Sequence, residues 1–104
     1  MMYSEFLEIS GRPEKYISFV EYTSLIEPIY MESELSKKDF IAIMNEGFDK
    51  IVNPAVEKAI RDLPMEDKLR MVYDDAPEIM EQIAKVDFQA RLVAYEYMKL
   101  MVNI

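Results

Sequence analysis

The sequence predicts an all-α protein: a compact bundle of five to six helices with a long C-terminal helix, folded as a single domain over residues 1–104. The chain contains only two glycines, Gly11 and Gly47, and no Asn-Gly or Asp-Gly turn between alternating apolar runs, so hairpin signals are absent. Helix-capping patterns recur along the whole chain instead. Its length of 104 residues is that of one ordinary domain.

Cap residues predict where the first helices begin and end. A short helix from Ser4 to Ile9 should stop at Gly11, because glycine readily adopts the left-handed conformation that ends helices. The sequence Ser18-Phe19-Val20-Glu21 fits a capping box and should start a second helix. Ser36-Lys37-Lys38-Asp39 should start a third helix in the same way.

Prolines predict where helices are interrupted. Pro28 lacks a backbone N–H, so we expect a break or kink around Glu27, with the following residues forming a separate turn or a continuation. Asn53-Pro54 combines a capping residue with proline at the first helical position. Residues 54–62 should therefore form a separate short helix that ends near Leu63-Pro64.

The last helix is expected to be the longest. A fifth helix should run from about Met65 to Tyr73, and after the capping pattern Asp75-Ala76-Pro77-Glu78 nothing interrupts the chain up to Ile104. Apolar residues at alternating spacings of four and three form a heptad seam along it: Ile79, Ile83, Val86, Ala90, Val93, Tyr97, Leu100 and Ile104. A second apolar set lies beside this seam, so the apolar surface is wider than the usual stripe of about 100°.

Such a wide apolar surface needs cover. The earlier helices could wrap the long helix as a central element, or a second copy of the chain could pack against it in a symmetric dimer. We favour the homodimer. Its predicted interface consists of seam residues: Ile83, Val86, Ala90, Val93, Tyr97 and Leu100.

Composition excludes several classes of protein. The chain has no cysteine and no histidine, which excludes disulfides, thiolate sites and the usual general base and zinc ligand. Two isolated glycines cannot form a phosphate-binding loop. The first residues lack the pattern of a signal peptide, and no window approaches the roughly 20 apolar residues of a membrane span. We therefore expect a cytoplasmic protein that binds no cofactor.

The net charge of −8 disfavours direct binding to nucleic acid. Residues 1–36 carry seven acidic side chains against two basic ones, and no basic stripe that could contact phosphates occurs in the chain.

One acidic cluster raises the question of catalysis. Asp74, Asp75, Glu78 and Glu81 lie close together in sequence and could form a weak Mg²⁺ or Ca²⁺ site, which would make the protein a carboxylate-dependent metal hydrolase. Acids also favour the N-terminus of a helix because they complement its dipole. We prefer this second explanation, so the sequence predicts no catalytic residue, no metal site and no enzyme.

Aromatic side chains among acids in the first thirty residues predict a surface for a protein partner. The residues assigned to it are Tyr16, Phe19, Tyr22, Glu27 and Tyr30. The alternative is that these side chains belong to the core of the bundle. The acidic N-terminal third could also act as a decoy that mimics nucleic acid and blocks a nucleic-acid-binding protein.

The first forty residues resemble the opening of short uncharacterised proteins encoded by bacterial phages and conjugative elements. The matching segments are Phe6-Leu7-Glu8-Ile9-Ser10-Gly11, Ile17-Ser18, Glu21-Tyr22, Ile26 to Met31 and Lys37-Lys38-Asp39-Phe40. Ser10 stands where these proteins usually have threonine. The resemblance implies an origin in a mobile element and no catalytic activity. Together these observations predict a non-enzymatic protein–protein interaction module.

Overall fold

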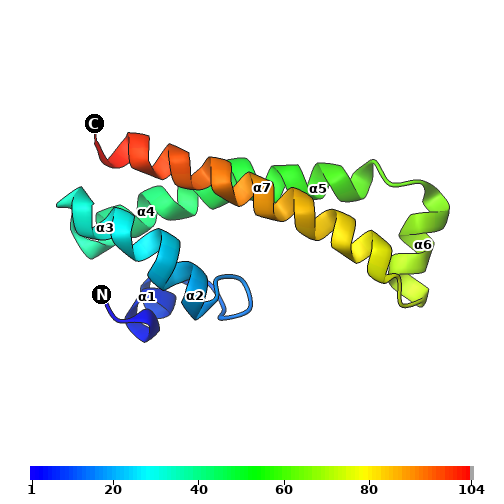
Figure 1. The fold of residues 1–104 in the computed structure, drawn as a ribbon, viewed down its shortest axis with the longest axis horizontal. Coiled ribbons are helices and arrows are strands. Elements are labelled where there is room, and N and C mark those ends of the chain that lie inside the picture. Colours follow the sequence, from blue (N-terminus) through cyan, green and yellow to red (C-terminus); the bar gives the residue numbers. More distant parts are fainter. Residues whose placement is uncertain (104) are drawn as a thin grey trace. The chain divides into compact units, whose positions relative to one another are not determined.

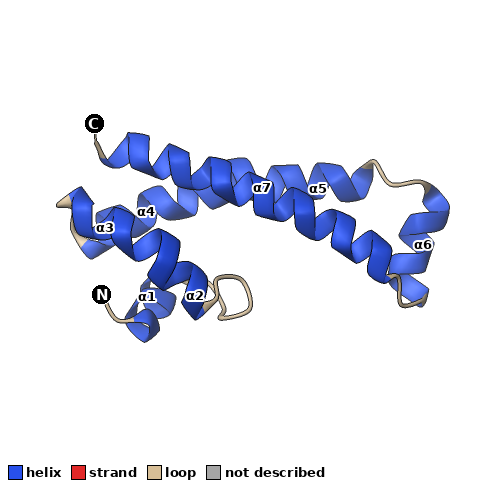
Figure 2. Ribbon diagram, viewed as in Figure 1, coloured by secondary structure: helices blue, strands red, loops and turns tan. Residues whose placement is uncertain are grey.

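The computed structural model describes residues 1–103, and all of the regular elements within them are helical (Figures 1 and 2). This confirms the all-α class and the long C-terminal helix. Five continuous helical segments follow one another, the second and third each containing a π-helical turn. They are α1 (Tyr3–Ser10); α2 (Phe19–Glu21) with η1 (Tyr22–Ile26) and α3 (Glu27–Ser33); α4 (Lys37–Gly47) with η2 (Phe48–Val52) and α5 (Asn53–Arg61); α6 (Met65–Tyr73); and α7 (Pro77–Val102). Ile104, the last residue of the predicted seam, lies outside the described residues.

The residues group into two compact units, which we describe separately. Unit 1 consists of Met1–Gly47 with the chain from Tyr95 onward, and unit 2 consists of Phe48–Ala94. The prediction of a single domain stays a prediction.

The predicted caps of the first helices are confirmed. The Ser18 side chain accepts a hydrogen bond from the Glu21 backbone N–H at 3.1 Å, and the Ser36 side chain accepts one from Asp39 at 3.1 Å. Gly11 ends α1 with a φ of 72°, and its N–H donates to the Leu7 carbonyl. These bonds satisfy backbone groups that have no partner within the helix, which is why the chain turns at these positions.

The chain does not break at Pro28: the predicted continuation occurs, and a π-helical turn directly precedes the proline. In the π-helical turn η1, the Glu27 N–H donates to the Tyr22 carbonyl, five residues earlier. A proline ring clashes with the carbonyl of the preceding turn of an α-helix. A π turn inserts one extra residue and moves that carbonyl aside. Pro28 is therefore accommodated inside a continuous helix over residues 19–33.

The helix predicted over residues 54–62 forms as α5 (Asn53–Arg61) and ends where expected, but the prediction that it is separate is wrong. The π-helical turn η2 leads directly into α5, and Val52 already has helical angles, with φ −73° and ψ −55°. Asn53 does not cap a helix. Its side-chain amide donates to Asp49 Oδ1 at 3.2 Å, within the same continuous helix.

Unit 1 has a well-filled core. Large side chains from α1, η1, α4, α7 and the loop before α2 are fully buried: Phe6, Ile17, Tyr22, Ile26, Phe40, Met44 and Met98. The rings of Phe6 and Tyr22 are 4.4 Å apart between centroids. The last part of α7 is tied to this core by Tyr95, whose hydroxyl donates to Glu21, and by Tyr97, whose hydroxyl donates to Glu46 Oε1 at 2.8 Å. Each fully buried side chain of this size stabilises the fold by roughly 1.5–3 kcal/mol.

Unit 2 buries less. Leu63, Ala76 and Ile79 form a small buried cluster, with Met71 and Ile83 packed partly against it. Neither α5 nor α6 contains a buried residue. Both helices are amphipathic, yet all of their apolar residues remain at least partly exposed within this chain. Among the described residues, no helix is both long enough and apolar enough to cross a membrane.

Candidate protein interface

The most exposed apolar surface of unit 2 lies on α6. Met65, Leu69, Val72 and Tyr73 are spaced so that they share one side of this helix. Their exposed fractions are 68%, 50%, 72% and 78%, respectively. We call these four residues the α6 face. Met71 lies on the other side of the helix and packs toward the Leu63 cluster. The helix therefore contacts the rest of the unit through its less apolar side and exposes its more apolar side to solvent.

Opposite charges border the α6 face. At 100° per residue, Lys68 lies along one edge of the face and Glu66 along the other, next to Tyr73. Neither Glu66 nor Lys68 forms an ion pair within the described part of the chain. Arg70 lies farther around the helix and pairs with Glu78. The face thus has one basic edge and one acidic edge.

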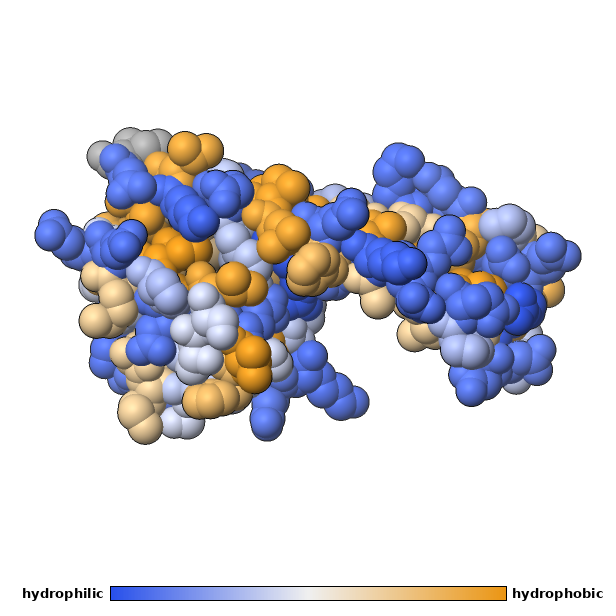
Figure 3. Space-filling model, in the orientation of Figure 1, coloured by the Kyte–Doolittle hydropathy of each residue, from blue (hydrophilic) through white to orange (hydrophobic). Residues whose placement is uncertain are grey.

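A second exposed apolar surface runs along α7. Met80, Ala84, Phe88 and Leu92 recur every four residues and are all exposed. Residues four apart line up as a ridge on the surface of a helix. We call these residues the α7 ridge. Figure 3 shows hydrophobic residues reaching the surface in the middle of the stretch that α7 follows in Figure 1.

The charged side chains beside the α7 ridge pair with one another. Lys85 lies 3.7 Å from Glu81 on one side, and Arg91 pairs with Asp87 on the other. The Arg91 guanidinium also lies over the Phe48 ring, 5.3 Å from its centroid. A partner that covers the ridge therefore meets an apolar strip whose bordering charges already have counterions.

The predicted heptad seam only partly follows the side of α7 that the chain buries. Ile79 and Ala90 are buried, and Ile83, Val86 and Tyr97 are partly buried. Toward the C-terminus the buried positions move to Ala94 and Met98, while Val93 is 57% and Leu100 70% exposed. At about 100° per residue, Ala94 lies on a different side of the helix from Val93, so the buried side of α7 changes toward its C-terminus. The drift of a 3.5-residue seam, about 20° per heptad, accounts for only part of this change. Pairing of two copies through the seam stays a prediction.

The aromatic residues predicted to bind a partner in the N-terminal region occupy different environments. Tyr22 lies in the core, with its hydroxyl donating to the Met1 carbonyl at 2.7 Å. Tyr30 is partly buried and packs on Phe40, with 5.2 Å between ring centroids. Tyr16 is also partly buried, beneath the Arg12 guanidinium at 5.0 Å. Phe19 alone among them is mainly exposed. The alternative that these rings belong to the core therefore holds for Tyr22, and binding of a partner by the other residues of this region stays a prediction.

Three of the seven acids in residues 1–36 are held by contacts within unit 1. Lys37 Nζ donates to both carboxylate oxygens of Glu5 at 2.9 Å, which lowers the pKa of Glu5 and raises that of Lys37. Glu21 accepts from Tyr95. Glu27, also predicted to bind a partner, lies 4.0 Å from the Met1 nitrogen and is partly buried. A decoy for nucleic-acid-binding proteins needs free carboxylates, and these three are already engaged.

The acidic cluster at the start of α7 has helix-terminal geometry. A hydrogen bond to its own backbone N–H and, secondarily, the bond from Arg70 lower the pKa of Glu78. Glu81 faces Lys85 in the next turn. Within residues 1–103, no three acidic side chains come together in a way that could hold a metal ion. The favourable interaction of an acidic side chain with the helix dipole accounts for the position of Glu78 at the start of α7.

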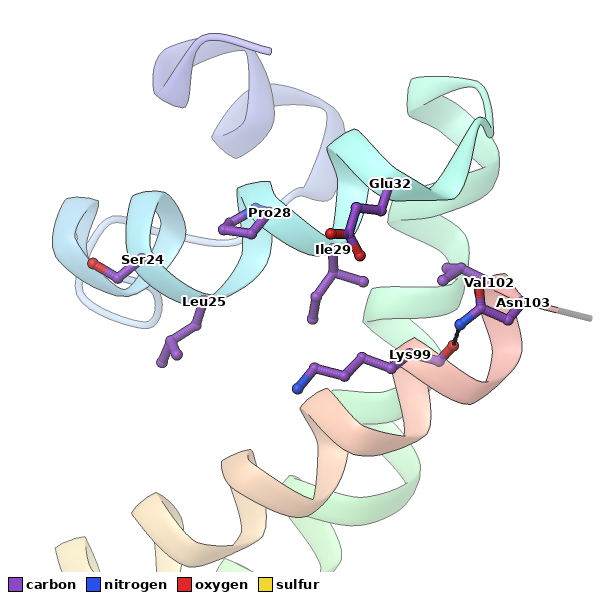
Figure 4. A pocket seen from close by; sticks show the side chains of 8 residues that line it. All are labelled: Ser24, Leu25, Pro28, Ile29, Glu32, Lys99, Val102 and Asn103. Atoms are coloured by element: carbon purple, nitrogen blue, oxygen red, sulfur yellow. Dashed lines mark hydrogen bonds between the residues drawn. The ribbon is translucent and has the colours of Figure 1, made fainter.

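Two hollows lie in the surface, one in each unit. The hollow of unit 1 has a volume of about 330 Å³ and is lined by Ser24, Leu25, Pro28, Ile29, Glu32, Lys99, Val102 and Asn103 (Figure 4). Lys99 extends along it, but its amine already lies 3.0 Å from Glu96. The hollow of unit 2, of about 450 Å³, is lined by Ala59, Asp62, Leu63, Pro64, Asp67, Gln82, Ile83 and Val86. Asp62 is bound there by Lys58 at 2.7 Å, which lowers the pKa of Asp62.

The sequence analysis missed the α6 face. Its apolar residues at positions 65, 69, 72 and 73 have helical spacing that the sequence shows. This pattern predicts an amphipathic helix, and the ordinary expectation is that its apolar side is buried. The structure instead places that side in solvent.

Comparisons of the chain with protein-family models, curated proteins and solved structures found no match. The function must therefore be argued from the residues and their geometry.

Proposed function

We propose that this chain is a non-enzymatic protein–protein interaction module that binds a partner protein through the α7 ridge. The single observation that supports this most strongly is the exposure of four apolar residues at helical spacing on one long helix: Met80, Ala84, Phe88 and Leu92. Isolated apolar residues are common on protein surfaces, whereas aligned ones mark interaction sites.

The ridge has the dimensions of a helix-docking surface. Its twelve-residue span corresponds to about 18 Å at 1.5 Å per residue. Ridges of residues four apart pack into the grooves of a neighbouring helix, which is the commonest mode of helix–helix contact. Phe88, near its middle, is 59% exposed and provides a large side chain that a partner could bury. Central aromatic residues of this kind contribute much of the binding free energy in known interfaces.

The electrostatics of α7 also favour a protein partner. Covering a charged side chain that has no counterion is costly, and this cost opposes binding. Here the bordering charges are paired within the helix, Glu81 with Lys85 and Asp87 with Arg91. A partner can therefore cover the ridge without burying a charged side chain that has no counterion.

The test is site-specific photo-crosslinking in the cells from which the chain comes. A photoreactive phenylalanine analogue at position 88 or 92 should give a discrete adduct with another protein. The matched control places the analogue at Gln89, which is exposed on another side of the same helix. Adducts from positions 88 and 92 but not from 89 would support the proposal. Equal yields at all three positions, or none from the ridge, would refute it.

The proposal includes self-association, for which a surface other than the predicted seam is argued below, and a cytoplasmic location, as expected from the sequence. A cysteine-free chain needs no oxidising compartment for its stability. An origin in a mobile genetic element would fit a small module whose role is to bind a host or structural protein.

A further inference from the structure

We infer that the α6 face is a self-association surface, where a second copy of this chain packs with its own α6 in parallel orientation. This inference rests on one part of the proposed function, namely that the module self-associates. It uses residues other than those of the α7 ridge and of the predicted seam.

The exposed area of the α6 face fits a small dimer interface. A large aromatic side chain buries about 150–250 Å², and smaller ones less, so four side chains exposed by half or more offer on the order of 500 Å² per copy. Two copies would bury about 1,000 Å² in total, which is near the lower limit for a specific protein interface. The area therefore predicts a reversible dimer that dissociates on dilution.

The charges at the edges of the face select the orientation. When two identical helices pack face to face in parallel, opposite edges of the two faces meet, so the Lys68 edge of one copy lies against the Glu66 edge of the other. In an antiparallel pair like edges meet, which would bring Lys68 against its own counterpart. Complementary edges fix orientation more than affinity. Neither residue forms an ion pair within the described part of the chain, although Lys68 is close enough to Asp62 to contribute to lowering the pKa of that carboxyl, so both can pair across a dimer.

A second copy is also the occupant best matched to the face itself. For two identical helices packed in parallel, a self-complementary surface presents opposite charges on its two edges, as this one does. A partner with a strongly basic or strongly acidic helix would suit only one edge. The same two-sided pattern therefore favours identical chains over a partner of one charge.

Sedimentation velocity over a micromolar concentration series tests the inference with the full chain. The wild type should shift reversibly from 12.3 kDa toward twice that mass. Leu69→Glu should remain monomeric at every concentration. The matched control, Val93→Glu, introduces the same charge at another exposed apolar residue, one that belongs to the predicted seam. It should dimerise as the wild type does. Circular dichroism of each variant establishes that it is folded.

Charge reversal then tests the parallel orientation at low salt. Lys68→Glu alone or Glu66→Lys alone makes the two meeting edges alike and should weaken the dimer several-fold. The combined exchange, Lys68→Glu with Glu66→Lys, restores opposite edges and should restore the dissociation constant. Failure of the double variant to recover would contradict the parallel arrangement.

The remaining outcomes separate this inference from the proposed function. A wild type that stays monomeric at all concentrations would overturn the inference, and crosslinking from position 88 would then still support the proposed module. A dimer lost in Val93→Glu but retained in Leu69→Glu would overturn it in favour of pairing through the seam.

Discussion

Unit 1 and unit 2 bury their apolar side chains to different degrees, although both are helical and similarly rich in them. In unit 1 large side chains such as Phe6, Tyr22 and Phe40 are fully buried. In unit 2 the cluster around Leu63 and Ile79 is small, and α5 and α6 bury no residue. Buried apolar surface stabilises a fold, and exposed apolar surface is available to a partner. Unit 1 therefore buries more large side chains, although Phe48 and Val52 of unit 2 are also fully buried, and unit 2 carries the exposed apolar residues of α6 and α7.

The largest expected effect comes from opening the core of unit 1. Phe6→Ala should lower the free energy of unfolding by about 3–5 kcal/mol, because it removes a fully buried ring and leaves a cavity against Tyr22. Urea unfolding followed by circular dichroism measures this loss. Phe19→Ala is the matched control, since Phe19 is mainly exposed, and it should cost under about 1 kcal/mol. Equal losses for the two variants would contradict the assignment of the core to Phe6.

A smaller and more local effect is expected in unit 2. Ile79→Ala removes the largest buried side chain of the Leu63 cluster and should cost about 2 kcal/mol, the lower end for such substitutions. Hydrogen exchange should show faster exchange in α6 and at the start of α7, with little change in α1. A uniform increase in the exchange rate across both units would show that the effect of Ile79→Ala is not confined to unit 2.

Tyr22 links stability to pH within unit 1. Burial is the main cause that raises its pKa to about 12 from an ordinary 10.0. A folded-state pKa above the unfolded one contributes stability that is fully present below pH 10 and is lost as the pH rises toward about 12. Tyr22→Phe should cost about 1 kcal/mol at neutral pH through the lost bond to the Met1 carbonyl. Its unfolding free energy should then fall less than that of the wild type between these pH values.

The smallest expected effect is a gain in stability. Glu34 follows α3 with a φ of 57°, a left-handed conformation that side chains other than glycine adopt at a cost. Glu34→Gly should therefore stabilise the protein by roughly 0.5–1 kcal/mol. Gly11 occupies the equivalent position after α1 with a φ of 72°, so Gly11→Ala should lower the stability of the protein. A loss of stability in Glu34→Gly would count against this explanation.

Local chemistry in the sequence was enough to predict most helix boundaries. Ser18, Ser36 and Gly11 cap helices as their residue types predict, and residues 65–73 form the helix expected there. Pro54 misled the prediction, and Pro28 left a break and a continuation both open, because a proline can end a helix or follow a π turn. Which of the two occurs depends on packing with distant residues, which one sequence does not show.

The candidate interface was less predictable than the fold. The excess apolar surface of α7 was expected, and Phe88, Val93 and Leu100 are indeed exposed on it. The heptad seam was extended too far because the buried side of α7 changes along its 26 residues, and that change depends on neighbouring helices more than on the small drift in helical phase. Whether the apolar side of α6 is buried depends on which neighbours surround it, so periodicity alone could not identify the α6 face.

The central claim is that the exposed apolar residues of unit 2 are covered by other chains in the cell, and methionine oxidation tests it most directly. Met65 and Met80 are exposed in unit 2, Met31 is exposed in unit 1, and Met44 and Met98 are fully buried. Brief peroxide treatment followed by mass spectrometry should oxidise Met65, Met80 and Met31 rapidly in the dilute purified chain. In intact cells Met65 and Met80 should become protected while Met31 stays reactive and the two buried residues resist oxidation in both samples. Equal oxidation of Met65, Met80 and Met31 in cells would contradict the account.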